Sequence, residues 1–515
     1  MSEFCTARTE LLDKFRAEPR LIRPHQSITR AEVSRLKILQ RKRAGEAVRS
    51  LFEPASVAVV GASDDPTKFG YLLMSNLLDF GYKGKIYPVN RKRETVFGLR
   101  CYPTVKAIPD EVEAVIVLVP AEHTLQIMQE CVEKSVSGVI ICTSGFREAG
   151  RGGAELEEKI LETAGKGGIR IAGPNTTGFL NAYNGFTSAF VKISRPRPGN
   201  VSIISQTGMF ASVLLEHILS TQPFGLSKVA GLGNKTDIDD ADVLEYYEDD
   251  EETKVIAIYA EGIKDGRRFL EVSKRVARKK PIIILKSARS SSGGRAALTH
   301  TGSLMVRDEI FDAVCRAAGL IRVEDIEELI DLAKAFALLP AARGDRVGVI
   351  AYTGAGCVMS ADAIERYGLK LATPTEETME RLRRHAPSFG ILSNPLDAEL
   401  VRQGVGDPQT SLIISLEAFL SDPEVDMVSL VLVGLTKESK IWDVDIDEVF
   451  PKIRQRFPEK PLVVTNLASR EVMDEYRERL ERLGIPVYPS LLRNIRALSA
   501  LNKYYCRIRH SGHVS

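Results

Sequence analysis

Short runs of aliphatic and β-branched residues alternate with amphipathic stretches from residue 51 to the C-terminal region. This alternation predicts parallel sheets whose strands are joined by crossover helices. The predicted strands form three sets: SVAVV (56–60), KIYPV (85–89), AVIVLV (114–119), GVIIC (138–142) and IRIA (169–172); VSIIS (201–205), SKVAG (227–231), VIAIY (255–259), PIIIL (281–285) and GLIRV (319–323); RVGVIAY (346–352), LKLA (369–372), MVSLVLV (427–433), PLVVT (461–465) and IPVYP (485–489). We therefore expect three doubly wound α/β units.

Two segments interrupt this pattern and are typical of linkers, RPRPGN (195–200) and LLPAARGD (338–345). A basic stretch precedes the first unit and has a helical pattern over residues 27–52, with Ser27 or Thr29 as its cap. The predicted organisation is a helical extension (1–50), three α/β units (51–195, 196–340 and 345–497) and a tail (498–515). Ligands of such sheets bind beyond the carboxyl ends of the strands, so we expect the sites in the loops that follow them.

Composition narrows the class of protein without adding a site. The chain has 515 residues, a formal net charge of +2 and 44% hydrophobic residues, which gives no argument for binding nucleic acid or a membrane. No apolar run approaches the ~20 residues of a membrane span. Seven scattered cysteines without a C-x-x-C pair predict neither a zinc site nor disulfides, and we expect a cytoplasmic protein with no bound metal.

The turn after the first strand, VAVVGAS, leads into a helical stretch that starts at Gly70. Small residues there let backbone N–H groups approach a phosphate. The G-x-G-x-x-G fingerprint is absent, and bases (91–93) follow the second strand where an NAD enzyme would carry an acid. The bases are compatible with a phosphate of CoA or of NADP, or they could simply be exposed to solvent. They argue against NAD as the ligand. Two further loops end at the same edge, TSGFREAG (143–150) and GPNTTG (173–178), in which Asn175 could be a ligand or purely structural.

The second unit contains residues suited to phosphoryl chemistry. Ser205 to Gly208 open an apolar helical stretch, so their N–H groups face a potential anion. Glu261 lies just beyond the strand 255–259, and His300 lies in a Ser/Gly-rich loop beyond the strand 281–285. A carboxylate that holds one ring nitrogen would leave the other free as a nucleophile.

Taken together, these motifs resemble the α subunit of ADP-forming acetyl-CoA synthetases, relatives of succinyl-CoA synthetase. The resemblance covers roughly residues 51–495 and rests on VAVVGAS, IYPVN-x-K, GPN, SQTG, GLGNKTDID, AEG-x-x-DGRRF and THTGSL. It implies a Rossmann-like CoA-binding domain followed by two flavodoxin-like doubly wound domains. Two departures stand out: Thr176 replaces the family's Cys after GPN, and TGAGCV (353–358) replaces a Gly-Gly-Pro-Gly loop.

The resemblance also implies roles for single residues. His300 matches the phosphorylated histidine, and Glu261 matches the carboxylate that orients its ring. The phosphate would be held by Ser205, Gln206, Thr207 and Gly208, with Asn234 near the acyl phosphate. The candidate CoA-binding residues are Gly61, Ser63, Gly70, Asn90, Lys92, Pro120 and Asn175.

The implied reaction converts acyl-CoA, ADP and phosphate into a carboxylic acid, CoA and ATP through an acyl phosphate and a phosphohistidine. We find no Walker motif and no ATP-grasp stretch. The nucleotide and its Mg²⁺ are therefore expected mainly on a separate ATP-grasp β subunit, in an α2β2 complex. A non-catalytic CoA-binding sensor or scaffold is the alternative, and an NADP-dependent oxidoreductase is a weaker one. The acyl group, the physiological direction and the choice of ADP or GDP stay open.

Overall fold

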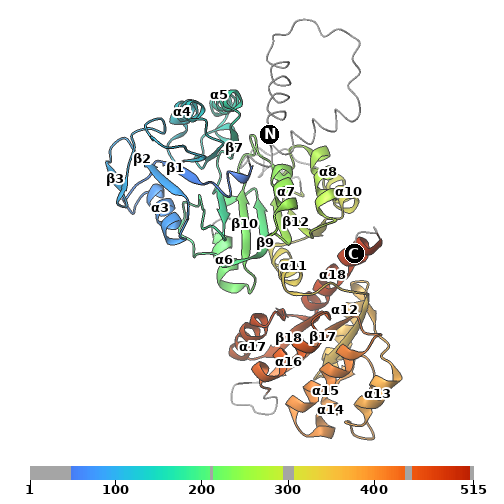
Figure 1. Cartoon of the computed structure of the whole chain (residues 1–515). Coiled ribbons are helices and arrows are strands. Elements are labelled where there is room, and N and C mark those ends of the chain that lie inside the picture. Colours follow the sequence, from blue (N-terminus) through green and yellow to red (C-terminus); the bar gives the residue numbers. More distant parts are fainter. Residues whose placement is uncertain are drawn as a thin grey trace, which may run out of the picture. The chain divides into compact units, whose positions relative to one another are not determined.

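The computed structural model describes residues 48–208, 213–290, 292–293, 307–434, 436 and 444–510. All elements named below belong to the compact unit formed by residues 45–515 (Figure 1). The helix predicted over residues 27–52 lies almost entirely outside the described residues. No described helix combines the length and apolar character that a membrane crossing needs.

The first sheet is parallel, with the strand order β2-β1-β5-β6-β7. Its strands confirm the first predicted set: β1 (Ser56–Val60), β2 (Lys85–Val89), β5 (Ala114–Val117), β6 (Gly138–Ile141) and β7 (Arg170–Ala172). Alternate residues of β1 enter two different cores, one with α3 (Phe69–Asp79) and the other with α4 (Thr124–Glu133) and α5 (Arg151–Gly167). A sheet covered on both faces explains the nearly continuous apolar runs. The small hairpin of β3 (Thr95–Val96) and β4 (Leu99–Arg100) was not predicted.

The second sheet has the order β13-β12-β11-β9-β10-β8. Its predicted strands are confirmed as β9 (Pro198–Ser205), β10 (Leu226–Gly231), β11 (Val255–Ala260), β12 (Ile282–Lys286) and β13 (Ile321–Val323). The linker predicted at 195–200 is wrong in its second half, because β9 already begins at Pro198. The helices of this unit are α6 (Val213–Thr221), α7 (Asp240–Asp249), α8 (Gly266–Val276), α10 (Asp308–Ala318) and α11 (Ile326–Leu338).

One strand of the second sheet comes from a segment that the sequence pattern assigned to the first unit. β8 (Phe179–Asn181) pairs antiparallel with β10, and Ala230 lies opposite Phe179. The chain therefore passes into the second sheet directly after the GPNTTG loop. A three-residue strand offers too little periodicity to be recognised from sequence alone.

The third sheet has the order β15-β14-β17-β18-β19, with β16 also paired to β14. The strands are β14 (Arg346–Ala351), β15 (Lys370–Leu371), β16 (Leu396–Asp397), β17 (Met427–Gly434), β18 (Leu462–Ala468) and β19 (Val487–Tyr488). The helices are α12 (Gly354–Arg366), α13 (Glu376–Arg383), α14 (Ala398–Val405), α15 (Pro408–Ser421), α16 (Ile446–Arg456), α17 (Arg470–Arg482) and α18 (Leu491–His510). All predicted strands of the third set are present, and only β16 was missed.

A continuous hydrophobic core joins the second and third sheets. Helix α11 is buried at every position from Leu329 to Phe336, because it packs on β11 and β12 and also on α18. Helix α18 continues through residue 498, the predicted start of a C-terminal tail, and Leu501 and Tyr504 on this helix are buried in the same core. A buried ion pair crosses this junction: Lys334 Nζ donates to Glu481 Oε1 (2.6 Å) and to the carbonyl oxygen of Val487 (2.7 Å).

We predict that Lys334→Met lowers the free energy of unfolding by about 3–5 kcal/mol, because it leaves the carboxylate of Glu481 buried without its cation. The double variant Lys334→Met/Glu481→Gln should recover much of this loss. Urea denaturation followed by circular dichroism measures both. Arg482→Met, which breaks an exposed pair with Glu478, should change stability by less than about 1 kcal/mol. Equal effects of Lys334→Met and Arg482→Met would contradict a stabilising role for the buried pair.

Candidate functional site

The carboxyl edge of the first sheet brings together three loops that carry predicted CoA residues. Val60 pairs with both Val89 and Val117, so β1, β2 and β5 end at the same level. Gly61, with φ +96°, makes the turn after β1. A Cβ on Gly70 would lie 2.0 Å from the carbonyl oxygen of Gly61, so the first turn of α3 rests directly on that turn. Only glycine permits this approach, which leaves the start of α3 open to a phosphate.

Hydrogen bonds hold the loop after β2 against the loop after β1. Asn90 donates from Nδ2 to the carbonyl oxygen of Ala62 (2.9 Å) and accepts the Lys92 N–H at Oδ1 (2.9 Å). Ser63 is buried, and its Oγ accepts the Asp65 N–H (3.0 Å). The side chain of Lys92 is exposed at this edge.

The remaining bases of this edge have acidic or amide neighbours. Arg93 pairs with Asp64 (3.3 Å), and Arg91 donates to Gln126 (3.2 Å). Pro120 is exposed and begins the short turn that follows β5. All the CoA residues predicted on the loops after β1, β2 and β5 therefore lie at one sheet edge.

The GPNTTG loop after β7 lies against the GLGNKTD loop after β10. The N–H groups of Asn234 and Thr236 donate to the carbonyl oxygens of Pro174 (2.9 Å) and Gly173 (3.0 Å). A Cβ on Gly233 would lie 2.3 Å from the Pro174 oxygen, so the two backbones are in direct contact. These bonds place the candidate residues of the two loops at the junction of the two sheets.

The backbone of Asn175 and the side chain of Thr176 hold this loop in place. Asn175 adopts a left-handed conformation (φ +56°), and its N–H donates to the carbonyl oxygen of Thr143 (2.9 Å). The Thr176 hydroxyl donates to the carbonyl oxygen of Gly231 (2.6 Å) and accepts the Gly178 N–H (2.9 Å). The departure from the family's Cys at this position therefore adds a hydrogen-bonded connection between the first and second sheets.

Glu148 was not predicted, and it contacts the candidate residue Asn234. Asn234 donates from Nδ2 to Glu148 Oε2 (2.6 Å), and the N–H groups of Gly145 (2.7 Å) and Phe146 (3.1 Å) donate to Oε1. Burial raises the pKa of Glu148, but these hydrogen bonds outweigh it and bring the pKa below its usual value. The carboxylate is therefore ionised, which fixes the Asn234 amide with its nitrogen toward Glu148. The Asn234 Oδ1 is buried without a hydrogen-bond partner among the described residues.

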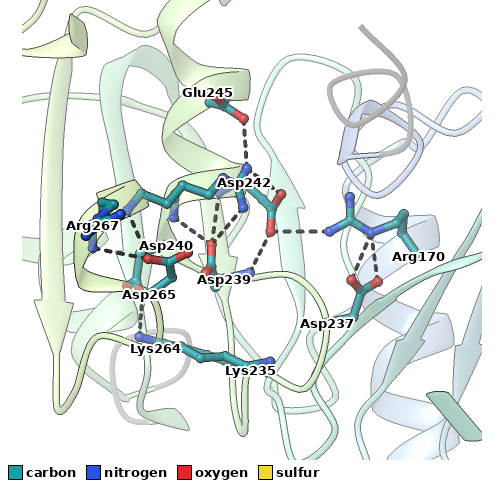
Figure 2. Close-up of polar contacts among 12 residues, drawn as sticks. Arg170, Lys235, Asp237, Asp239, Asp240, Asp242, Glu245, Lys264, Asp265 and Arg267 are labelled. Atoms are coloured by element: carbon teal, nitrogen blue, oxygen red, sulfur yellow. Dashed lines mark hydrogen bonds and ion pairs between the residues drawn. The ribbon is translucent and has the colours of Figure 1, made fainter. Parts of the chain in front are cut away.

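A network of ion pairs supports the GLGNKTD loop and the start of α7 (Figure 2). Arg170 binds Asp237 (2.8 Å) and approaches Asp242 (3.3 Å). Asp239 caps α7 by accepting the N–H groups of Ala241 and Asp242, while the Asp242 carboxylate accepts the Asp239 N–H. Burial, followed by the neighbouring Asp242 and Asp240 carboxylates, raises the pKa of Asp239 to about 6.

Two lysines, one in this loop and one in the loop after β11, hold the acidic cluster and the GLGNKTD loop in place. Lys235 Nζ binds Asp240 (2.5 Å) and the carbonyl oxygen of Gly262 (3.0 Å). Lys264 donates to the carbonyl oxygens of Lys235 (3.1 Å) and Thr236 (2.6 Å). The GLGNKTD loop is thus fastened to the segment that contains Glu261.

The carboxyl edge of the second sheet holds the predicted phosphate segment beside Glu261. Ser205 pairs with Tyr259 on β11, and the Gln206 Oε1 accepts the N–H groups of Glu261 and Gly262 (3.0 Å each). Glu261 is 7% exposed. The Gln206 side chain therefore fixes the backbone from which the Glu261 carboxylate extends.

The other residues of the phosphate segment form a tight turn. Ser205 Oγ donates to the Thr207 carbonyl oxygen (2.9 Å) and accepts its N–H (3.2 Å). A Cβ on Gly208 would lie 3.0 Å from the Thr177 methyl group, so this turn abuts the GPNTTG loop. The helix predicted directly after Gly208 is described from Val213 onward.

His300 lies outside the described residues. The strand that leads to it, β12, pairs with β11 so that Lys286 lies opposite Ala260, next to Glu261. Within the described part of the chain, no three His, Cys, Asp or Glu side chains are grouped as a metal site would require. The departure at residues 353–358 forms the start of α12 on the third sheet, where Thr353 is the N-cap without a side-chain capping bond.

Comparisons with known proteins match this architecture. A CoA binding domain model matches residues 55–182, and a succinyl-CoA ligase like flavodoxin domain model matches residues 198–336. The chain is 40% identical over 475 residues to the ADP-forming acetate–CoA ligase II of Archaeoglobus fulgidus, covering 92% of this chain and 69% of that protein. It is 40% identical over 472 residues to the α subunit of the ADP-forming acetate–CoA ligase I of Pyrococcus furiosus, covering 89% and 97%.

A solved structure agrees with the fold over nearly the same length. The dinucleotide-forming acetyl-coenzyme A synthetase 1 of Ca. Korarchaeum cryptofilum, in complex with phosphate and ADP, has a TM-score of 0.82 and 32% identity, covering 91% of this chain and 99% of that one. The predicted fold class and the predicted resemblance are both confirmed. On its sequence, its domains and its fold, the chain belongs to the ADP-forming acetate–CoA ligases as an α-subunit-like part of an NDP-forming acyl-CoA synthetase.

Proposed function

We propose that His300 carries a phosphoryl group from an acyl phosphate, formed at the junction of the first two sheets, to a nucleotide held by a partner subunit. The observation that supports this most directly is the placement of Glu261. Its backbone is fixed by Gln206, and it lies beside the end of the strand that leads to His300. A buried carboxylate in this position is suited to hold one nitrogen of an imidazole ring.

The reaction has three reversible steps. A phosphate oxygen attacks the thioester carbonyl carbon of acyl-CoA, and the carbon–sulfur bond breaks to release CoA and an acyl phosphate. The free ring nitrogen of His300 then attacks phosphorus, and the phosphorus–oxygen bond breaks to release the carboxylate. An oxygen of the ADP β-phosphate finally takes the phosphoryl group from the histidine, giving ATP.

In this proposal the phosphate binds at the turn formed by Ser205 to Gly208, beside Glu261. The Ser205 hydroxyl and the Gln206 side chain hold the backbone of this turn and of Glu261 in place. Phosphoryl transfer depends mainly on positioning and on neutralising charge, and a fixed turn contributes to the positioning. The buried Oδ1 of Asn234 is an acceptor, so it suits the O–H of a protonated phosphate or an amide N–H of the CoA arm.

The first sheet edge supports CoA binding through its close-packed turn. The pyrophosphate would lie at the start of α3, over Gly61, Ser63 and Gly70. Asn90 holds the adjacent loop, from which Lys92 can reach a ribose phosphate. Pro120 and Asn175 border the same edge on the path toward the second sheet.

We assign the nucleotide, with its Mg²⁺, mainly to a separate ATP-grasp β subunit in an α2β2 complex. The P. furiosus relative is named as an α subunit and is matched over 97% of its length, which supports such a division of the activity. The A. fulgidus ligase is a longer chain, of which 69% is matched. Mg²⁺ would neutralise the nucleotide phosphates there.

We predict that His300→Ala abolishes incorporation of ³²P when the chain is incubated with acetyl-CoA and ³²P-phosphate. The label on the wild type should be acid-labile and alkali-stable, as a phosphohistidine is. His217→Ala is the matched control, because His217 is exposed on α6 and should keep full labelling. Label that persists in His300→Ala would exclude His300 as the carrier. If neither the wild type nor any variant is labelled although all of them bind CoA, the result would favour a CoA sensor.

We predict that Gly70→Ala weakens CoA binding by at least about tenfold, or about 1.4 kcal/mol. The Ala side chain in Gly70→Ala would meet the Gly61 carbonyl oxygen and push α3 away from the turn. Titration calorimetry with CoA measures the effect, and circular dichroism checks the fold. Gly152→Ala has open space around its Cβ and should bind CoA like the wild type. Unchanged affinity in a folded Gly70→Ala protein would move the CoA site elsewhere.

The division of labour predicts that the isolated chain is labelled by acetyl-CoA and phosphate but forms no ATP from added ADP and Mg²⁺. ATP should appear when a candidate ATP-grasp β subunit is added, with loss of label from His300. A luciferase assay detects the ATP. Formation of ATP by this chain alone would show that the nucleotide site lies on it.

A further inference from the structure

The segment that contains His300 leaves the second sheet through an unusual backbone conformation. Ala288, two residues beyond β12, has φ +54°, in the left-handed region that non-glycine residues rarely adopt. Lys286 Nζ donates to the carbonyl oxygens of Ser287 (2.9 Å) and Ala288 (3.3 Å), although Lys286 itself is only 1% exposed. Burial lowers the pKa of this lysine. A strained residue and a buried lysine thus determine the direction in which the chain leaves β12.

The returning part of the same segment is tied to the departing part by an ion-pair network. Arg289 Nε donates to Asp308 Oδ2 (3.3 Å), and Arg322 Nη2 on β13 donates to Asp308 Oδ1 (2.6 Å). Arg289 also pairs with Glu324. We call Arg289, Asp308 and Arg322 the stem clasp, because they join the two ends of residues 290–307 to each other and to the sheet.

The two arginines of the clasp differ in exposure, because the side chain of Arg289 is 38% exposed while that of Arg322 is largely buried. Arg322 is 11% exposed and lies over the ring of buried Phe311, as does the Lys286 ammonium group, at 5.5 and 5.7 Å from the ring centroid. Burial raises the pKa of Asp308, but the guanidinium groups of Arg322 and Arg289 outweigh it and lower the pKa below its usual value. The Asp308 carboxylate therefore stays ionised at neutral pH.

The proposed phosphoryl transfer to His300 suggests a role for the stem clasp beyond the stability of the fold. No intermediate of phosphoryl transfer forms unless the histidine nitrogen meets phosphorus at close range and in line. In the sequence, His300 lies between Arg289 and Asp308, which we call the two stems of its segment. The contacts of Arg289 and Asp308 fix the stems to each other and to β13.

We propose that the stem clasp is a positioning device for His300, acting through the two ends of its segment and touching no substrate. The inference rests on the proposed role of His300. It assigns Arg289 and Asp308 a part in the rate of histidine phosphorylation and none in the binding of CoA.

The test uses Arg289→Gln in the full chain, which removes the link between the stems and leaves the Asp308–Arg322 pair intact. Arg316→Gln is the matched control: Arg316 also pairs with an aspartate, Asp312, but both lie on α10, so no stem is released. The single-turnover rate of ³²P incorporation from saturating acetyl-CoA and phosphate is measured for both. We expect a fall of at least about tenfold for Arg289→Gln, since small displacements of reacting groups have large effects on rate.

Three further readouts separate positioning from a general loss of structure. The Kd for CoA and the melting temperature should be similar for Arg289→Gln, Arg316→Gln and the wild type, and Arg289→Lys, which keeps the charge, should recover part of the rate. Asp308→Asn removes the carboxylate that both arginines of the clasp bind. It should slow labelling at least as much as Arg289→Gln does. Equal labelling rates for wild type, Arg289→Gln and Arg316→Gln would overturn the clasp. Absence of label on the wild type would instead overturn the proposed role of His300.

Discussion

The backbone of residues 173–178 lies directly against that of residues 231–236, and this contact fixes how the first and second sheets meet. Gly173 and Gly233 have no side chains to separate the loops, and two N–H groups cross from one to the other. Thr176 adds a side-chain bond to Gly231. The carboxyl edges of both sheets, with the predicted CoA residues on one and Glu261 on the other, come together because this contact is so short. The proposed attack of phosphate on a CoA thioester requires the CoA site and the phosphate site to lie close together.

The electrostatics of the junction follow from the same contact. Glu148 and Glu157 extend from the first unit to the GLGNKTD loop, where Asn234 and Thr236 donate to them. Carboxylates so near a phosphate site would repel the ligand if they were not engaged. Each is held by N–H or O–H donors. The acids at the start of α7 are balanced by Arg170 and Lys235 (Figure 2) and also by Arg268.

The sequence was sufficient to predict the three sheets, because strands buried on both faces are continuous apolar runs. It was not sufficient for β8, whose three residues show no period, or for the start of β9 in a Pro-rich stretch. The candidates Gly61, Asn90 and Glu261 could be selected from the sequence because they follow strand ends, and Ser205 because it ends a strand. Glu148, Lys286 and Asp308 could not, since their roles depend on partners far away in the sequence or on a backbone conformation that residue type does not reveal.

The shared core between the second and third sheets limits how the phosphoryl group can travel. A swing of the third unit would have to expose α11, which is buried from Leu329 to Phe336, and separate Lys334 from Glu481. Breaking a buried pair of this kind is strongly unfavourable, and the apolar surface of α18 would be exposed with it. Rotation of the third unit is therefore an unfavourable way to bring the proposed phosphohistidine to a distant nucleotide.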